Sequence, residues 1–182
     1  MLIIAALYYF LPAYFANMAP NFFRKTLAFL AKPIDCGKSF RGQRLLGANK
    51  TWRGVIMGTI LAIVIVLLQR FLSTYPFFQQ ISLINYSSLT LWKTILLGFL
   101  LGFGALVGDS AKSFFKRQAK IPPGKSFFPF DQLDFVIGGL LFSFILFIPA
   151  PLAILTIIVA SPILHIVVKF IGYILKIDKA KF

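Results

Sequence analysis

Acidic residues are scarce in this sequence, and residues that bind metals through nitrogen or sulfur are almost missing. Charged residues make up 13% of the chain, against about one-quarter in soluble domains, and no glutamate occurs among its 182 residues. There is one cysteine, Cys36, and one histidine, His165. A lone cysteine excludes an intrachain disulfide and a cysteine-based metal cage, and a lone histidine excludes a pair of catalytic histidines. Any acidic side chain with a chemical role is therefore one of five aspartates.

Hydrophobic residues account for 59% of the chain and gather in long runs that are typical of membrane-spanning helices. A helix needs about 20 apolar residues to cross the hydrocarbon core of a bilayer. The last run is long enough for two short spans, and Pro149 and Pro151 interrupt it because neither can donate an amide hydrogen. We therefore predict an all-α integral membrane protein, with a single transmembrane domain over residues 1–182 and five helices at about 2–23, 54–72, 89–107, 135–149 and 152–170.

The basic residues predict how these helices are oriented. Seventeen of the 19 lysines and arginines fall in the segments 24–53 and 109–134 and in the tail that begins at Lys169. The N-terminal residues and the connector at 73–88 carry no charged side chain. Because loops rich in lysine and arginine remain in the cytoplasm, we predict a multi-pass protein of the cell membrane with its N-terminus outside and its C-terminus cytoplasmic. The long loops 24–53 and 109–134 are then cytoplasmic, and so is any active site that they form.

Three aspartates lie close to helix ends in the second predicted loop. Asp109 follows the third helix, while Asp131 and Asp134 stand three residues apart before the fourth, a spacing that puts both on one face of a helical turn. Carboxylates so close repel each other unless a cation lies between them, and oxygen ligands favour Mg²⁺. The alternative is that these acids offset nearby basic residues or cap helices. Their position beside three basic side chains on one membrane face favours a metal–phosphate site.

The first predicted loop ends in a Lys-Thr pair at the start of the second helix. Free amides at a helix N-terminus, together with the Lys50 ammonium and the Thr51 hydroxyl, suit a phosphate group. The segment is not a Walker A loop, because that motif requires a preceding strand and glycines at a set spacing. The alternative interpretation is the basic flank of an ordinary membrane helix.

Taken together, the two segments resemble the phosphatidate cytidylyltransferases, and most closely their archaeal branch, the CDP-archaeol synthases. A Lys-Thr-x-x-Gly element is matched by residues 50–54, and a Gly-Asp-x-x-x-Ser-x-x-Lys-Arg element by residues 108–117. The closing Asp-x-x-Asp is matched by Asp131 and Asp134, and parts of the stretch 33–47 resemble the archaeal branch in particular. Where bacterial members carry an acid before the serine, this chain has Lys112, one of several departures that favour an archaeal ether lipid over diacylglycerol.

The resemblance implies transfer of a cytidylyl group from CTP to 2,3-di-O-geranylgeranylglyceryl phosphate, giving CDP-archaeol and pyrophosphate in ether phospholipid biosynthesis. The attacking phosphate oxygen is already ionised near neutral pH, so the reaction needs no general base. Mg²⁺ is the implied cofactor, and CTP, the prenylated lipid and membrane lipids are the implied partners.

The site residues that follow from this resemblance fall into three groups. Those expected to hold Mg²⁺ are Asp109, Asp131 and Asp134, which form the catalytic set together with Lys116. Those expected to bind CTP are Asn49, Lys50, Thr51, Ser113, Lys116 and Arg117. Those expected to bind the lipid phosphate are Lys38, Arg41, Arg44 and Lys112.

Other functions fit the sequence less well. An enzyme of the CDP-alcohol phosphotransferase class requires Asp-Gly and a final pair of aspartates four apart, whereas Ser110 follows Asp109 and the final pair here is three apart. An anion transporter predicts ionisable groups midway through its helices, and here they lie at helix ends. A structural protein that docks on anionic lipids leaves the aspartates unexplained. Nucleic acid is not an expected partner, because the basic patches line a bilayer.

Overall fold

The computed structural model describes residues 1–122, 125, 127 and 130–174 of the chain. Its elements in chain order are α1 (Leu2–Phe22), the 3-10 helix η1 (Ala28–Leu30), β1 (Ser39–Phe40), β2 (Gln43–Arg44), α2 (Trp52–Leu72), α3 (Pro76–Gln80), the 3-10 helix η2 (Tyr86–Ser88), α4 (Leu91–Gln118), α5 (Phe130–Ser143) and α6 (Pro151–Ile174). The two short strands pair antiparallel within the first predicted loop. Most of the basic tail, beyond residue 174, and positions 123–124, 126 and 128–129 of the second loop lie outside the described residues.

Helices α1, α2 and α4 are each long and apolar enough to cross a bilayer. Helix α5 is shorter, with 14 residues, and α6 begins with an apolar stretch over Pro151–Leu164. The prediction of a helical membrane protein is therefore confirmed, with α1, α2 and α4 as clear candidates for its spans.

The second predicted loop is helical at both of its ends. Helix α4 does not end at 107 but continues to Gln118, and α5 begins at Phe130 rather than at 135. Hydropathy marks the apolar part of a helix, and the polar residues that follow extend the same helix because its backbone hydrogen bonds do not depend on apolar side chains. Helix α5 also ends earlier than predicted, at Ser143, and a turn leads from there to Pro151 at the start of α6.

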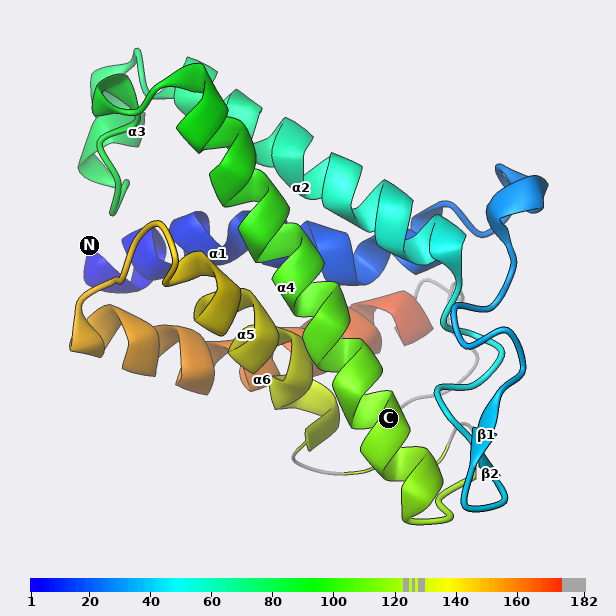
Figure 1. Cartoon of the computed structure of the whole chain (residues 1–182). Coiled ribbons are helices and arrows are strands. Elements are labelled where there is room, and N and C mark those ends of the chain that lie inside the picture. The colour runs from blue at the N-terminus through cyan, green and yellow to red at the C-terminus, as the bar shows by residue number, and fades with distance from the viewer. Residues whose placement is uncertain (123–124, 126, 128–129, 175–182) are drawn as a thin grey trace.

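Helix α4 runs across the whole molecule and packs against α1, α2 and α5 (Figure 1). The core between these helices is built from large buried side chains, among them Tyr9 and Phe10 of α1, Leu101 of α4 and Phe135 of α5. This packing holds α4 as a rigid axis, with α3 near its first turn and the β1–β2 hairpin near its last (Figure 1).

Buried and partly buried hydrogen bonds fix the end of the bundle near α3. The Tyr86 hydroxyl donates to Gln69 Oε1 at 3.0 Å, and Gln69 in turn donates to the backbone of α1 at the Tyr8 carbonyl. Arg70 Nη1 donates to the Tyr86 carbonyl at 3.1 Å and to Thr94 Oγ1 at 2.9 Å. The connector between α2 and α4 is therefore tied to both helices, which sets their spacing at this end.

Three glycines allow α4 and α5 to touch backbone to backbone. A Cβ atom added to Gly138 of α5 would overlap the Gly104 carbonyl oxygen of α4 and lie 2.8 Å from the Gly108 Cα. A Cβ atom on Gly108 would overlap the Asp134 carbonyl oxygen. Small residues let helices approach more closely than side chains normally permit, a common device in membrane proteins. This contact brings the last turns of α4 against the first turns of α5.

We expect Gly138→Ala to lower the free energy of unfolding by about 1–3 kcal/mol, because overpacking at a helix contact costs that much. Gly54→Ala is the matched control: its new Cβ would meet Pro20 Cγ at 3.2 Å, with no backbone overlap. Thermal unfolding of both variants in detergent measures the difference. An equal stability of Gly138→Ala and Gly54→Ala would contradict the glycine contact.

Candidate active site: a carboxylate–ammonium cluster between α4 and α5

Charged side chains from two helices meet where α4 and α5 touch. Asp109, Lys112 and Lys116 follow one another at spacings of three and four residues, so they share one face of α4. Asp131 and Asp134 occupy the first turns of α5, again three residues apart. The glycine contact turns the two faces toward each other, and five charged groups come together beside the last turns of α4.

The Lys112 ammonium lies at the centre of this cluster and contacts all three aspartates. Its Nζ is 2.8 Å from Asp134 Oδ2, 3.0 Å from Asp131 Oδ1 and 3.3 Å from Asp109 Oδ1. Only 16% of the Lys112 side chain and 4% of the Asp134 side chain are exposed. Buried charges are stable only when they are paired, and here the Lys112 ammonium is paired with three carboxylates.

Each carboxylate also has a second partner. Asp131 accepts a hydrogen bond from the Phe127 amide at 2.6 Å and lies 3.1 Å from Lys116 Nζ. Asp134 Oδ1 accepts a hydrogen bond from the Phe135 amide at 2.6 Å. Burial raises the pKa of the Asp131 carboxyl, but the Phe127 amide and the two ammonium groups outweigh it and lower that pKa to about 2. Asp131 is therefore a carboxylate at neutral pH.

Lys50 brings the first loop into the cluster through an ion pair with Asp109. The loop that carries Lys50 is closed at its base, where the Ile34 amide donates to the Lys50 carbonyl at 2.9 Å and the Trp52 amide donates to the Lys32 carbonyl at 3.0 Å. Thr51 then starts α2, since its hydroxyl accepts a hydrogen bond from the Gly54 amide. The end of the loop is thus fixed against both α2 and α4.

Asp35 is the internal anchor of the first loop. Its buried carboxylate accepts two hydrogen bonds from the Arg44 guanidinium and three more from the amides of Gly37, Leu46 and Gly47, all at 3.0–3.1 Å. The Arg44 guanidinium, followed by these amides, holds the pKa of the Asp35 carboxyl far below its usual range despite burial. Its contribution to stability is therefore complete above the unfolded pKa of about 4 and is lost only as the pH falls through the lower folded value.

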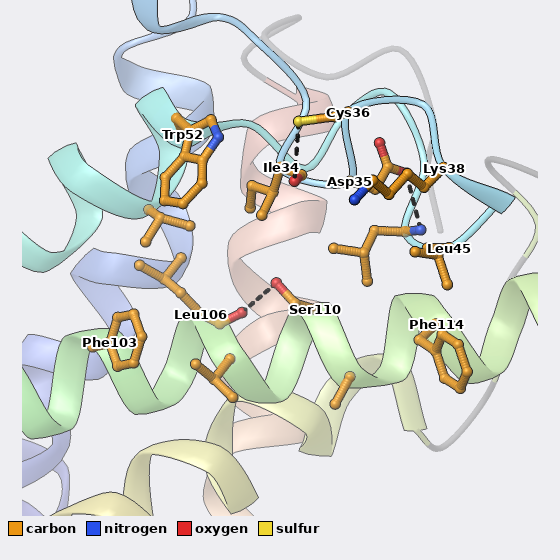
Figure 2. A pocket seen from close by; sticks show the side chains of 14 residues that line it. Ile34, Asp35, Cys36, Lys38, Leu45, Trp52, Phe103, Leu106, Ser110 and Phe114 are labelled. Carbon is orange, nitrogen blue, oxygen red and sulfur yellow. Dashed lines mark hydrogen bonds between the residues drawn. The ribbon is translucent and has the colours of Figure 1, made fainter. Parts of the chain in front are cut away.

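An apolar cavity of about 620 Å³ lies between this loop and α4. Figure 2 shows Phe103, Leu106, Ser110 and Phe114 of α4 facing the loop. The opposite wall is formed by Ile34, Asp35, Cys36, Lys38, Leu45 and Leu46, and the end near α2 by Trp52 and Val55. The volume is within the range of small-molecule sites. The cavity lies on another face of α4 than the charged cluster. At 3.6 residues per turn, the four α4 residues named above share one face of the helix, and Asp109, Lys112 and Lys116 share a different one.

The structure brings together six of the residues that the sequence singled out: Lys50, Asp109, Lys112, Lys116, Asp131 and Asp134. Lys112 was expected to bind the lipid phosphate, but its ammonium lies among the aspartates. No three His, Cys, Asp or Glu side chains within the described ranges are arranged to hold one metal ion. The point on which the three expected ligands converge is occupied by that ammonium.

The remaining predicted residues lie around the cluster. Ser113 donates a hydrogen bond to the Asp109 carbonyl of its own helix at 2.9 Å, and Arg117 follows Lys116 in a half-buried position. Asn49, Lys38 and Arg41 are exposed on the first loop.

Arg44 has a partner that the sequence did not predict, because its guanidinium forms an ion pair with Asp35. Sequence reasoning missed Asp35 as the anchor of this loop. The available signal was an acid in an acid-poor chain, inside a stretch that resembles the archaeal branch.

We expect Asp35→Asn to loosen the first loop, because an amide nitrogen would then face groups that are all hydrogen-bond donors. Tryptic cleavage after Lys38 and Arg41, followed by mass spectrometry, should become about tenfold faster or more. Ser39→Ala, an exposed change in the same loop, serves as the control and should leave the cleavage rate unchanged. Equal cleavage of Asp35→Asn and the unmodified chain would show that Asp35 does not anchor the loop.

Comparison with known proteins identifies the family. A family model described as CarS-like, CDP-archaeol synthase, matches residues 1–182. The CDP-archaeol synthase of Thermococcus kodakarensis is 38% identical over 169 residues, covering 92% of this chain and 90% of the relative. That of Pyrococcus furiosus is 34% identical over 175 residues, covering 96% and 95%, and that of Methanocaldococcus jannaschii is 36% identical over 174 residues, covering 94% and 93%.

A solved structure shares the fold. It is described as an intramembrane enzyme for archaeal membrane lipids biosynthesis, and it superposes with a TM-score of 0.71 at 28% identity, covering 92% of this chain and 94% of that one. The resemblance seen in the sequence motifs is therefore confirmed by similarity over nearly the whole chain. The chain belongs to the CDP-archaeol synthase family of lipid cytidylyltransferase enzymes.

Proposed function

We propose that this enzyme transfers the cytidylyl group of CTP to 2,3-di-O-geranylgeranylglyceryl phosphate at the α4–α5 cluster. A phosphate oxygen of the lipid forms a bond to the α-phosphorus of CTP, and the bond from that phosphorus to the bridging oxygen of pyrophosphate breaks. The products are CDP-archaeol, which stays in the membrane, and pyrophosphate. The proposal is supported above all by the meeting of Lys50, Lys112 and Lys116 with three aspartates at one membrane boundary.

The main difficulty of this reaction is electrostatic, because two anionic substrates must approach each other. The attacking phosphate monoester is ionised near neutral pH, so no side chain has to remove a proton. A reaction without a general base suits this cluster, which consists of carboxylates and ammonium groups in a chain that contains no glutamate. Lys50, Lys112 and Lys116 supply positive charge for the phosphates of CTP and for the departing pyrophosphate.

Mg²⁺ belongs to the proposal as the cofactor. The donor chemistry fits, since carboxylate oxygens from two helices face one point. Asp134 Oδ2 is buried there and, within the described residues, receives no hydrogen bond of good geometry despite its 2.8 Å contact with the Lys112 ammonium. Asp109, Asp131 and Asp134 would hold the ion, which supplies charge stabilisation to phosphate oxygens when it is bound. As they are placed, the three side chains do not form a metal site, because Lys112 Nζ occupies the point that they face. They would hold the ion only after that ammonium has left and the carboxylate oxygens have moved closer together.

The lipid substrate and the membrane orientation complete the proposal. An apolar cavity that suits isoprenoid chains lies beside Phe103, Leu106 and Phe114, on another face of α4 than the cluster. The apolar runs of the sequence support five spans, and the distribution of basic residues supports an orientation with the cluster and the first loop on the cytoplasmic face, where CTP is available.

The test uses purified protein with labelled CTP, the geranylgeranylated glycerol phosphate and Mg²⁺, with CDP-lipid as the measured product. Asp131→Asn and Lys116→Met should each lower the rate by about 10²–10³-fold, the usual effect of removing one charge-stabilising contact. Lys93→Met repeats the lysine substitution at an exposed position near the first turn of α4 and should leave the rate unchanged.

Sealed vesicles of both orientations test the proposed face, because CTP does not cross a bilayer. CDP-lipid should form when CTP is added to inverted vesicles and should not form with right-side-out vesicles. Absence of CDP-lipid in the purified system, or normal turnover by Asp131→Asn, would overturn the assignment of the reaction. Product in right-side-out vesicles alone would overturn the orientation.

A further inference from the structure

The charged cluster is electrically balanced without any added ion. Three carboxylates, from Asp109, Asp131 and Asp134, face three ammonium groups, from Lys50, Lys112 and Lys116. A neutral cluster offers little net attraction to a free divalent cation. The point where all three carboxylates meet is also physically filled, because Lys112 Nζ lies 2.8–3.3 Å from an oxygen of each.

Lys112 differs from the other two lysines in the number of aspartates that it contacts. Lys50 pairs with Asp109 and Lys116 pairs with Asp131, whereas Lys112 contacts all three acids. Each acid keeps another partner if Lys112 leaves: Asp109 keeps Lys50, Asp131 keeps Lys116 and the Phe127 amide, and Asp134 keeps the Phe135 amide. The carboxylates can therefore hold their positions while this one ammonium moves.

The side chain of lysine is suited to such a movement. It carries a compact charge on a flexible four-carbon stem, so the ammonium can shift by several ångströms while the helix backbone stays in place. The backbone of α4 is fixed by its glycine contact with α5. Movement of Lys112 is thus a rotamer change and requires no rearrangement of helices.

We propose that Lys112 is a tethered cation that competes with Mg²⁺ for the three aspartates. In the substrate-free protein its ammonium closes the carboxylate site and keeps affinity for a free divalent ion low. When CTP phosphates arrive with the ion, the Lys112 ammonium would leave the carboxylates to that ion and pair with a phosphate instead. The same residue thereby couples metal binding to nucleotide binding. The proposal rests on the proposed function for the identity of the nucleotide, but the competition itself is a property of the protein and the metal alone.

The test measures binding of Mn²⁺, as a paramagnetic substitute for Mg²⁺, to the purified full chain without nucleotide or lipid. Free Mn²⁺ is quantified by electron paramagnetic resonance. Lys112→Met, which keeps a long side chain and removes its charge, should bind Mn²⁺ about tenfold more tightly or better, the usual size of coupling between competing ligands. Lys93→Met, on the same helix, should bind Mn²⁺ as weakly as the unmodified chain. Adding Asp131→Asn to Lys112→Met should remove the gain.

Stability provides a second readout, because removal of the Lys112 ammonium leaves three carboxylates facing two ammonium groups, and a replacement cation would restore the balance of charge. Mg²⁺ should raise the thermal unfolding temperature of Lys112→Met clearly more than that of the unmodified chain. If Lys112→Met folds only with metal, unfolding by a chelator that spares the unmodified chain supports the proposal equally well.

Three results would overturn the proposal: unchanged or weaker Mn²⁺ binding by Lys112→Met, a gain that persists with Asp131→Asn, or a Lys112→Met protein that fails to fold even with metal. These results are distinguishable from failure of the proposed function. A chain that makes no CDP-lipid yet shows the gain in Mn²⁺ affinity would refute the reaction and leave the role of Lys112 standing.

Discussion

The backbones of α4 and α5 touch at Gly104, Gly108 and Gly138, and the positions of the charged groups depend on this contact. With ordinary side chains at these positions, the two helices would be held further apart, and Asp131 and Asp134 would not reach Lys112. At the close spacing, the aspartates and lysines are pressed into one partly buried cluster, where each charge requires a partner. The close packing of α4 and α5 is therefore the reason why the aspartates and lysines at the end of these helices must pair with one another.

The first loop is positioned by a separate set of polar contacts. Asp35 gathers the Arg44 guanidinium and three backbone amides, and the base of the loop is closed beside Lys50. Lys50 then pairs with Asp109 on α4. The loop therefore supplies a cation to the cluster on one side and a wall to the apolar cavity on the other.

Much of this arrangement can be predicted from the sequence, because it follows from local patterns. Apolar runs mark the membrane helices, and the spacing of Asp131 and Asp134 places them on one helical face. The continuation of α4 to Gln118 could not be read from hydropathy, because its last turns are polar. The pairing of Asp35 with Arg44 depends on a loop with left-handed backbone at Gly37, Gly42 and Gly47, which no periodic pattern indicates.

The role of Lys112 was beyond prediction for a different reason. Its charge suggested a lipid phosphate as its partner, whereas its contacts depend on how closely α5 approaches α4. That distance is set by glycines thirty residues apart in the sequence, such as Gly108 and Gly138. The positive charge of lysine indicated an anionic partner, and the close contact between α4 and α5 provides the aspartate carboxylates as that partner.

The central claim is that CTP binds at the α4–α5 cluster, and protection of lysines from acetylation tests it most directly. The purified protein is treated briefly with an acetylating reagent, with and without CTP and Mg²⁺, and each lysine is quantified by mass spectrometry. The account predicts that CTP slows acetylation of Lys50 and Lys116 and leaves the exposed Lys32 and Lys93 unchanged. Unchanged acetylation of Lys50 and Lys116 in saturating CTP, or protection confined to lysines elsewhere, would contradict it.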